Sequence, residues 1–216
     1  MGVSVAYVGA PLEDEIRGVV QIPVLKIVYL DLTGLKKIDG ACVFTSKRGI
    51  VSLKMSNVSI KSNRIYCIGE QTAAHLQTLY SLTCQVPKVQ NSDGLAEMLI
   101  SKEKSIRIIS SDQISEKFLK KLRANDISVR HTVAYRIEEN VDVDYHLLEG
   151  AKRILIGSSR SFEILNKNAK GTLKGKKLYA IGKPTEETMI SLGFSPTECF
   201  ESPDIESVLA LLITKR

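Results

Sequence analysis

The chain contains one seven-residue pattern twice, 113 positions apart. Residues 66–72 read YCIGEQT, and residues 179–185 read YAIGKPT. Two further blocks repeat in the same order and at nearly the same offset. Such a period is too long for a solenoid repeat, so it indicates two copies of one domain. The further blocks are CVFTSKRGI (42–50) with ILIGSSRSF (154–162), and NSDGLAEML (91–99) with ESPDIESVL (201–209).

Each repeat alternates short apolar runs with stretches of helical periodicity. The runs are rich in β-forming residues and nearly continuous in apolar character, which is typical of parallel strands buried on both faces. Alternation of such strands with helices favours an α/β fold. The expected strands are 41–45, 64–69, 83–87 and 105–112 in the first repeat, and 153–157, 177–182 and 196–200 in the second.

The second repeat reaches the end of the chain without a counterpart of strand 105–112. The N-terminal run VSVAYVGA (3–10) has the required strand-then-turn character, so we predict that it completes this repeat. The two connecting segments are extended and rich in β-branched residues, unlike a flexible linker. The predicted fold class is therefore α/β, with two similar parallel-sheet lobes: a discontinuous lobe of residues 1–20 and 141–216, an inserted lobe of 38–127, and a two-stranded β-ladder hinge of 21–37 and 128–140.

The composition restricts the kinds of partner that the chain is expected to bind. Hydrophobic content of 44% and charged content of 25% are ordinary for a globular protein. No apolar run approaches membrane-spanning length and no secretion signal is visible, so we expect a cytoplasmic protein without a membrane partner. The net charge of +6 comes from scattered basic residues, without zinc-finger spacing or an aromatic RNA-binding signature. This balance favours a polyanionic small molecule over nucleic acid.

Several kinds of active site lack support in the sequence. Neither G-x-G-x-x-G after a strand nor a P-loop is present, and the four cysteines form no C-x-x-C pair. The three histidines have no metal-ligand spacing, so we expect no metal and no cofactor. The remaining chemistry is binding, orientation and hydrogen bonding.

The strand ends supply candidates for that chemistry. Ligands of parallel α/β sheets bind beyond the carboxyl ends of the strands, where helix N-termini favour carboxylates or phosphates. Each repeat offers two such loops, and we expect all four to face one cleft between the lobes. Any single loop is more readily explained as a helix cap, but the repetition of both loops favours binding for the set. The candidate binding residues are Ser46, Lys47, Arg48, Gly69 and Thr72 in the first repeat, and Ser158, Ser159, Arg160, Gly182, Lys183 and Thr185 in the second.

These blocks, taken in order over about residues 20–213, resemble the uroporphyrinogen-III synthase family. The resemblance implies two α/β lobes joined by a two-stranded ladder. It also implies a lyase reaction, the cofactor-free cyclisation of hydroxymethylbilane with inversion of ring D and loss of water. The substrate is a linear tetrapyrrole with an acetate and a propionate on every ring. A polycarboxylate of this kind is compatible with helix N-termini and basic loops in a monomer.

The resemblance also implies roles for particular residues. The family's important tyrosine corresponds to Tyr135 in the strand ending TVAYR, which implies a catalytic role. Its glycine-loop threonines correspond to Thr72 and Thr185, and its strand-end serines to Ser46 and Ser158. This chain departs from the family in two places. Lys47 replaces the usual proline, and the segment between Val8 and Pro23 is too short for the family's full helix and second strand.

A second hypothesis is a non-catalytic binding or regulatory module with the same two lobes, for a tetrapyrrole or another polyanionic small molecule. An enzyme that works by holding its substrate has the same sequence features as a binder. Incubation with hydroxymethylbilane distinguishes the two, because only the enzyme yields the type III isomer.

Overall fold

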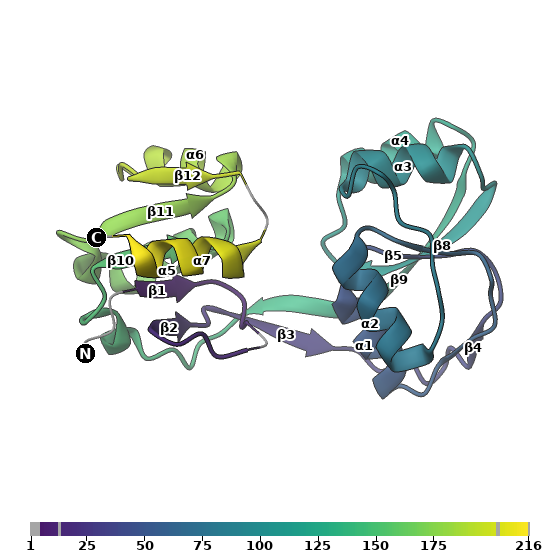
Figure 1. Cartoon of the computed structure of the whole chain (residues 1–216), viewed down its shortest axis with the longest axis horizontal. Helices are drawn as coiled ribbons and strands as arrows, with labels where there is room; N and C mark the ends of the chain where they lie inside the picture. The colour runs from purple at the N-terminus through teal and green to yellow at the C-terminus, as the bar shows by residue number, and fades with distance from the viewer. Residues whose placement is uncertain (1–4, 13, 202–203, 216) are drawn as a thin grey trace. The chain divides into compact units, whose positions relative to one another are not determined.

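The chain divides into two compact units (Figure 1). Unit 1 consists of Met1–Ile27 and Glu138–Arg216, and unit 2 of Val28–Ile137. The computed structural model describes residues 5–12, 14–201 and 204–215. Residues 3 and 4 of the predicted N-terminal strand lie outside this description.

Unit 1 is built on a five-stranded sheet in the order β12-β11-β10-β1-β2. Every neighbouring pair is parallel, and Val5 lies opposite both Arg153 and Val19. The predicted discontinuous α/β fold is thereby confirmed, because the N-terminal strand lies beside strands contributed by the second half of the chain. The strands are β1 (Val5–Val8), β2 (Val19–Ile22), β10 (Arg153–Ile156), β11 (Lys177–Ile181) and β12 (Glu198–Phe200).

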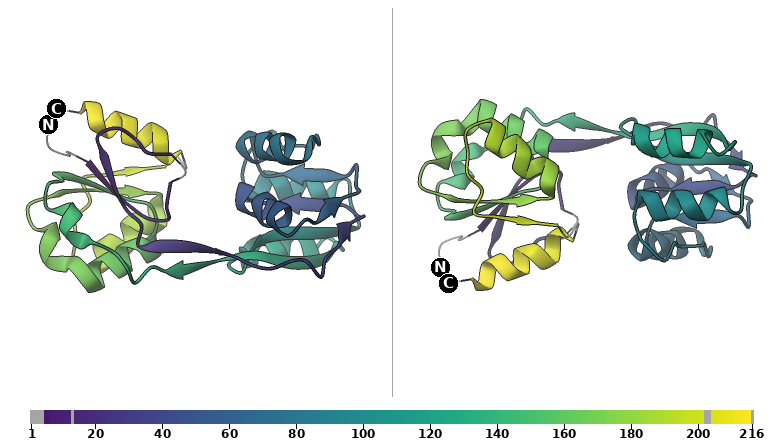
Figure 2. Two further views of the ribbon diagram at one scale, coloured as in Figure 1. Left: turned by 90° about the horizontal axis from the view of Figure 1, so that it is seen from below. Right: turned by 90° about the horizontal axis from the view of Figure 1, so that it is seen from above.

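Helices cover both faces of the sheet of unit 1, with α7 on one face and α5 and α6 on the other (Figure 2). The apolar side of α7 packs through Val208, Leu209 and Leu212 on a core that includes Tyr7 and Tyr179. Burial of these side chains stabilises the layer by about 1.5–3 kcal/mol for each large residue. The helices are η1 (Tyr145–Leu148), α5 (Ser159–Ala169), η2 (Lys170–Leu173), α6 (Lys183–Ser191) and α7 (Ile205–Thr214).

Unit 2 contains most of a second five-stranded sheet, in the order β3-β9-β8-β5-β7. Strands β9, β8, β5 and β7 run parallel. Strand β3 runs against β9, since Leu30 N donates to Ala134 O and Asn140 N to Val24 O. The strands are β3 (Leu25–Tyr29), β5 (Cys42–Phe44), β7 (Ile65–Cys67), β8 (Ser105–Ser111) and β9 (Ser128–Glu139), with a small parallel sheet of β4 (Lys37–Ile38) and β6 (Ser59–Ile60).

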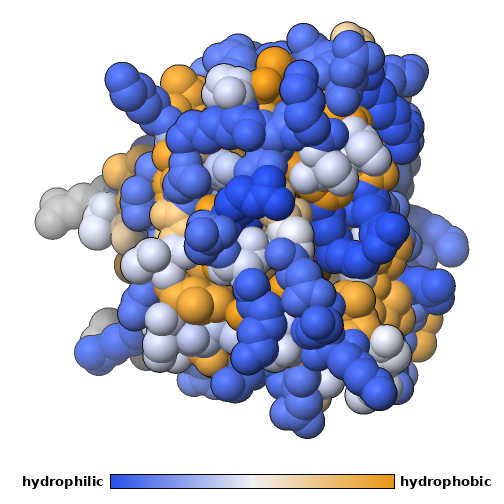
Figure 3. All heavy atoms as spheres, turned by 90° about the vertical axis from the view of Figure 1, so that its right-hand side faces the viewer, coloured by the Kyte–Doolittle hydropathy of each residue, from blue (hydrophilic) through white to orange (hydrophobic). Residues whose placement is uncertain are grey.

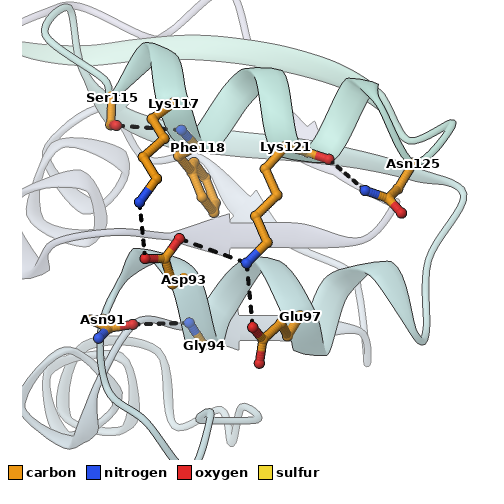
Figure 4. Close-up of polar contacts among 9 residues, drawn as sticks. All are labelled: Asn91, Asp93, Gly94, Glu97, Ser115, Lys117, Phe118, Lys121 and Asn125. Carbon is orange, nitrogen blue, oxygen red and sulfur yellow. Dashed lines mark hydrogen bonds and ion pairs between the residues drawn. The ribbon is translucent and has the colours of Figure 1, made fainter.

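Two helices of unit 2, α3 (Ser92–Ile100) and α4 (Glu116–Arg123), lie side by side over one face of this sheet (Figure 4). Lys121 Nζ lies 3.7 Å from Asp93 and 3.3 Å from Glu97, and Lys117 Nζ lies 3.3 Å from Asp93. Exposed ion pairs of this kind stabilise a protein little, so the buried apolar side of both helices holds them in place. The other helices are α1 (Lys47–Met55) and α2 (Glu70–Tyr80).

The segment 21–37, predicted as one side of a ladder, is divided among three sheets. Residues 21 and 22 end β2, β3 lies beside β9, and Lys37 begins β4. The interruption follows from Pro23, which lacks the N–H needed to continue a strand. The short segment after β1 has no helix in residues 9–12 and 14–18, yet it does contain β2.

The prediction of a strand at residues 83–87 is wrong. Only Gln85 pairs there, accepting from Cys67 N at 3.0 Å and donating to Ile65 O at 2.8 Å. Pro87 ends the pairing after this single bridge, because proline has no backbone N–H to donate.

Candidate active site

The first loop of unit 2 follows β5 and opens α1. Ser46 is the N-cap residue, with φ −164° and ψ 148°, and its Oγ accepts from Arg48 N at 3.2 Å. A Cβ atom at Gly49 would lie 2.9 Å from the Ile109 carbonyl oxygen, so the helix begins in backbone contact with β8. Ser46, Lys47 and Arg48 therefore lie at the carboxyl end of the sheet, where first-turn amides are available to an anion.

The second loop of unit 2 joins β7 to α2 through Gly69. The glycine has no side chain to cap the helix, and Gln90 performs this role because its Oε1 accepts from Glu70 N at 3.0 Å. Thr72 lies in the first turn of α2, but the residue is only 6% exposed. The structure thus places Thr72 in the packed interior beside the loop, and its contact with a ligand stays a prediction.

The first loop of unit 1 has nearly the same geometry as its counterpart in unit 2. Ser158 caps α5 with φ −166° and ψ 160°, and its Oγ accepts from Ser161 N at 3.2 Å. Ser159 Oγ donates to Pro184 O at 2.8 Å and so connects the first turns of α5 and α6. The two predicted loops of unit 1, including Arg160, are therefore brought together.

The second loop of unit 1 differs from that of unit 2. Gly182 has a positive φ of 78°, and Pro184 lies in the first turn of α6. Lys183 Nζ pairs with Glu186 Oε2 at 2.8 Å, and this hydrogen bond raises the pKa of Lys183. Thr185 is 3% exposed, so both glycine-loop threonines are interior residues.

Tyr135 lies in the second half of β9, opposite the carboxyl end of β8. It pairs with Ser111, the last residue of β8, just after a register shift between Ser110 and Ser111. The residue is 4% exposed, and the centroid of its ring lies 6.5 Å from that of Tyr29, with the ring planes tilted by 55°. The predicted catalytic tyrosine therefore lies at the same end of the sheet as Ser46, with its ring packed against a second tyrosine.

Two groups near the site residues were not predicted from the sequence. In unit 1, Cβ atoms at Gly9 and Gly157 would lie 2.2 Å and 2.7 Å from Tyr7 Oη, so both glycines make room for this hydroxyl. In unit 2, Ser110 Oγ lies 2.8 Å from His131 Nε2. A sequence signal existed in unit 1, because each glycine directly follows a buried strand, whereas Ser110 and His131 lie within β8 and β9.

Two negative observations apply to the residues that the structure describes. They include no group of three His, Cys, Asp or Glu side chains arranged to hold a metal ion. None of their helices has the length and apolar character needed to cross a membrane.

Comparison with known proteins assigns the chain to a family. No curated protein sequence matches it. Two solved structures are similar in fold: a uroporphyrinogen-III synthetase from Helicobacter pylori 26695 (18% identity, TM-score 0.70, covering 99% of each chain) and a mutant uroporphyrinogen III synthase from Thermus thermophilus (15% identity, TM-score 0.56, covering 98% of this chain and 97% of that one). The family model described as Uroporphyrinogen-III synthase HemD matches residues 9–210. The chain therefore belongs to the uroporphyrinogen-III synthase family, whose members are enzymes of tetrapyrrole biosynthesis.

Proposed function

We propose that this chain catalyses the cofactor-free cyclisation of hydroxymethylbilane, with inversion of ring D and loss of water, as a cyclising hydro-lyase. The main support is the duplicated start of a helix at the carboxyl end of each parallel sheet. Ser46 and Ser158 have backbone angles within about 12° of each other, and each side chain caps the helix that it opens. Family membership supports the same reaction.

Binding of the substrate relies on its carboxylates. First-turn amides carry a partial positive charge and suit such groups, and Arg48 and Arg160 follow the two capping serines. In this proposal Lys183 leaves Glu186 and pairs with a substrate carboxylate. Exchange of one exposed carboxylate partner for another costs little, because such pairs are weak in water.

The chemical step is departure of the terminal hydroxyl of hydroxymethylbilane as water. The resulting azafulvene is then attacked by the substituted carbon of ring D, which inverts that ring. Loss of hydroxide is slow unless a proton is delivered as the carbon–oxygen bond breaks, and acid assistance contributes about 10² to 10⁴ in rate. Tyr135 is the proposed donor, since a phenol hydroxyl donates a hydrogen bond and the residue lies opposite the carboxyl end of β8.

The burial of Tyr135 adds a condition to this mechanism. With only 4% of the residue exposed, its hydroxyl reaches a substrate only if the contact with Tyr29 opens on binding. The same burial favours the second candidate function, a module that binds a linear tetrapyrrole without converting it. In that case Tyr135 is a packing residue of the strand.

Product analysis tests the proposal. Purified protein is incubated with freshly generated hydroxymethylbilane, and the type I and type III isomers are resolved after oxidation. We expect predominantly type III, because ring closure without inversion yields type I. Type I product at the rate of a protein-free sample would overturn the enzymatic proposal, and retention of the unreacted substrate by the protein would then identify a binding module.

A further inference from the structure

A cavity of about 530 Å³ opens at the amino ends of the strands of unit 2, away from Ser46 and Tyr135. Ser105 and Ser128, the first residues of β8 and β9, lie on its wall. Figure 3 faces this end of unit 2 and shows hydrophilic side chains over much of its surface. The charged residues that line the cavity are Lys37, Asp39, Arg64, Arg107 and Arg130.

Two of these cations occupy neighbouring positions on adjacent strands. Arg107 of β8 and Arg130 of β9 are register partners in a parallel pair, so their side chains leave the same face of the sheet side by side. Like charges directly opposite one another destabilise a sheet. Burial, followed by the charge of Arg130, lowers the pKa of Arg107.

The acidic residues of this region are already paired with other groups. Glu103 is buried, and it accepts from Arg64 Nη1 at 2.9 Å and from Tyr66 Oη at 2.7 Å. Asp39 pairs with Lys37 at 3.2 Å. Arg107 Nη1 donates to Thr132 Oγ1 at 2.9 Å, and among the described residues neither Arg107 nor Arg130 has a carboxylate within ion-pair distance. Within the described part of the chain, the cavity thus retains two guanidinium charges without an anionic partner.

A bound ligand accounts for the adjacency of these two arginines better than a purely structural role does. Cations often lie near helix C-termini, where they balance the partial negative charge. Arg107 and Arg130, however, belong to strands, and each lies beside a like charge. An oxyanion that bridges the two guanidinium groups would remove this repulsion, because each planar fork can bind a carboxylate or a phosphate through two parallel hydrogen bonds.

We propose that this cavity is a second binding site, for a small ligand that bears a phosphate or several carboxylates and bridges Arg107 and Arg130. The volume lies in the range of small-molecule sites. The hydroxyls of Ser105 and Ser128 at the rim supply further donors. This proposal does not depend on the synthase reaction, which is assigned to the other end of the sheet.

Direct titration tests the site. Pyrophosphate and tricarballylate are titrated separately into the full chain at constant ionic strength, with binding followed by calorimetry and by the amide resonances of Arg107 and Arg130. We expect binding of at least one probe to weaken by about tenfold or more in the variant R107Q/R130Q, since charge-assisted hydrogen bonds to the ligand are lost. The probe that is affected shows whether the ligand chemistry is phosphate or carboxylate.

A matched control separates a site from a general effect of charge. The variant K152Q/K174Q also removes two cations, both exposed in unit 1, and should bind like the unchanged protein. Equal weakening in the two variants, or equal binding by R107Q/R130Q and the unchanged protein, would overturn the proposal. The melting temperature of R107Q/R130Q without ligand should stay the same or rise, because the repulsion is removed. Type III synthesis serves as a separate measurement and should be unchanged in this variant.

Discussion

The two copies of Y-x-I-G-x-x-T share their interior but differ at the loop. Tyr66 and Tyr179 are both buried in the cores of their units. The glycines differ, since Gly69 is extended with φ −164° whereas Gly182 has φ 78°. The loop of unit 2 is completed by the side chain of Gln90, and the loop of unit 1 by a proline within the helix. The common motif thus reflects a shared core position. The loops differ through residues that the copies do not share, which are Gln90 outside the motif and Pro184 at one of its variable positions.

The two units also differ at the end of one strand. Strand β9 of unit 2 places Tyr135 opposite the last residue of β8, while β2 of unit 1 places Ile22 opposite the last residue of β1. Both residues are buried. At this position unit 2 has a hydroxyl that could act as an acid, whereas unit 1 has the apolar side chain of Ile22. The duplicated fold therefore does not by itself supply the group that the proposed chemistry requires.

The largest expected effect tests this second difference. Tyr135→Phe keeps the ring and removes the hydroxyl, so we expect the rate of type III synthesis to fall by about 10² to 10⁴ if Tyr135 is the acid. Single-turnover kinetics with hydroxymethylbilane measures this loss. Because the ring that packs against Tyr29 is kept, the melting temperature should change little.

Tyr80→Phe is the matched control. It removes a phenol hydroxyl from the same unit, where Tyr80 Oη donates to Val58 O at 2.9 Å. This variant should keep its activity and lose about 1 kcal/mol of stability. Full activity of Tyr135→Phe would show that Tyr135 packs the strand, and the difference between β9 and β2 would then have no catalytic meaning.

The next effect concerns the two glycines. Gly182→Ala forces a side chain into a left-handed conformation, so we expect a loss of about 1–3 kcal/mol. In Gly69→Ala the new Cβ meets only the flexible end of Gln90, at 2.7 Å, and the expected loss is about 0.5–1 kcal/mol as the cap is displaced. Calorimetric melting of both variants measures these losses. Equal losses would mean that the two loops impose the same constraint.

The double variant Gly69→Ala/Gln90→Ala tests whether Gln90 caps the helix that follows the loop of unit 2. If Gly69→Ala acts by displacing Gln90, it should cost nothing further once Gln90→Ala has removed the cap, as a double-mutant cycle would reveal. Additive losses would contradict a cap supplied by Gln90.

The capping serines test the similarity of the units. Ser46→Ala and Ser158→Ala each remove an N-cap, which costs about 0.5–2 kcal/mol. Ser158 Oγ also lies 2.7 Å from Ser161 Oγ, so its replacement should cost more. Melting temperatures give the comparison. A larger loss for Ser46→Ala would show that the shared backbone angles do not reflect shared energetics.

The smallest effect concerns the charge at the second loop, where Lys183 of unit 1 corresponds to Glu70 of unit 2. If Lys183 binds substrate, Lys183→Gln should raise KM about two- to fivefold, and Glu186→Gln should lower it by freeing the lysine. Since Glu186 raises the pKa of Lys183, any stabilisation by the pair is present at pH 7 and is lost only as the pH rises above the usual range of lysine. Changes of KM in the same direction would exclude competition for Lys183.

Much of the fold was predictable because the two copies of the repeat could be compared with each other. Strand and helix positions agreed between the copies, and the missing strand of the second repeat could be found at Val5–Val8. The strand predicted at 83–87 was wrong because a local sequence pattern does not show how many residues pair. Pairing there depends on the neighbouring Tyr66 and is ended by Pro87.

The site was less predictable, because it depends on packing across long sequence separations. Periodicity does not show that Thr72 and Thr185 point inward, since a first-turn hydroxyl can cap, bind or pack. The adjacency of Arg107 and Arg130 requires the register of β8 against β9, which no local pattern gives. Ser46, Ser158 and Tyr135 were found because repetition or family resemblance singled them out, and their roles in binding and catalysis remain predictions.

The interior position of β1 has a consequence for synthesis on the ribosome. This strand leaves the ribosome before the other strands of its sheet, yet its neighbour β10 begins only at Arg153. Unit 2 is continuous in sequence, so it can fold while the later part of the chain is still being made. Until β10 emerges, the edge of the Val5–Val8 strand that pairs with β10 has no partner, and the apolar surface of the strand is exposed. In the finished protein the strand is buried. Chaperones that shield nascent apolar strands should therefore bind the Val5–Val8 strand during translation and release it once the second half of unit 1 is complete.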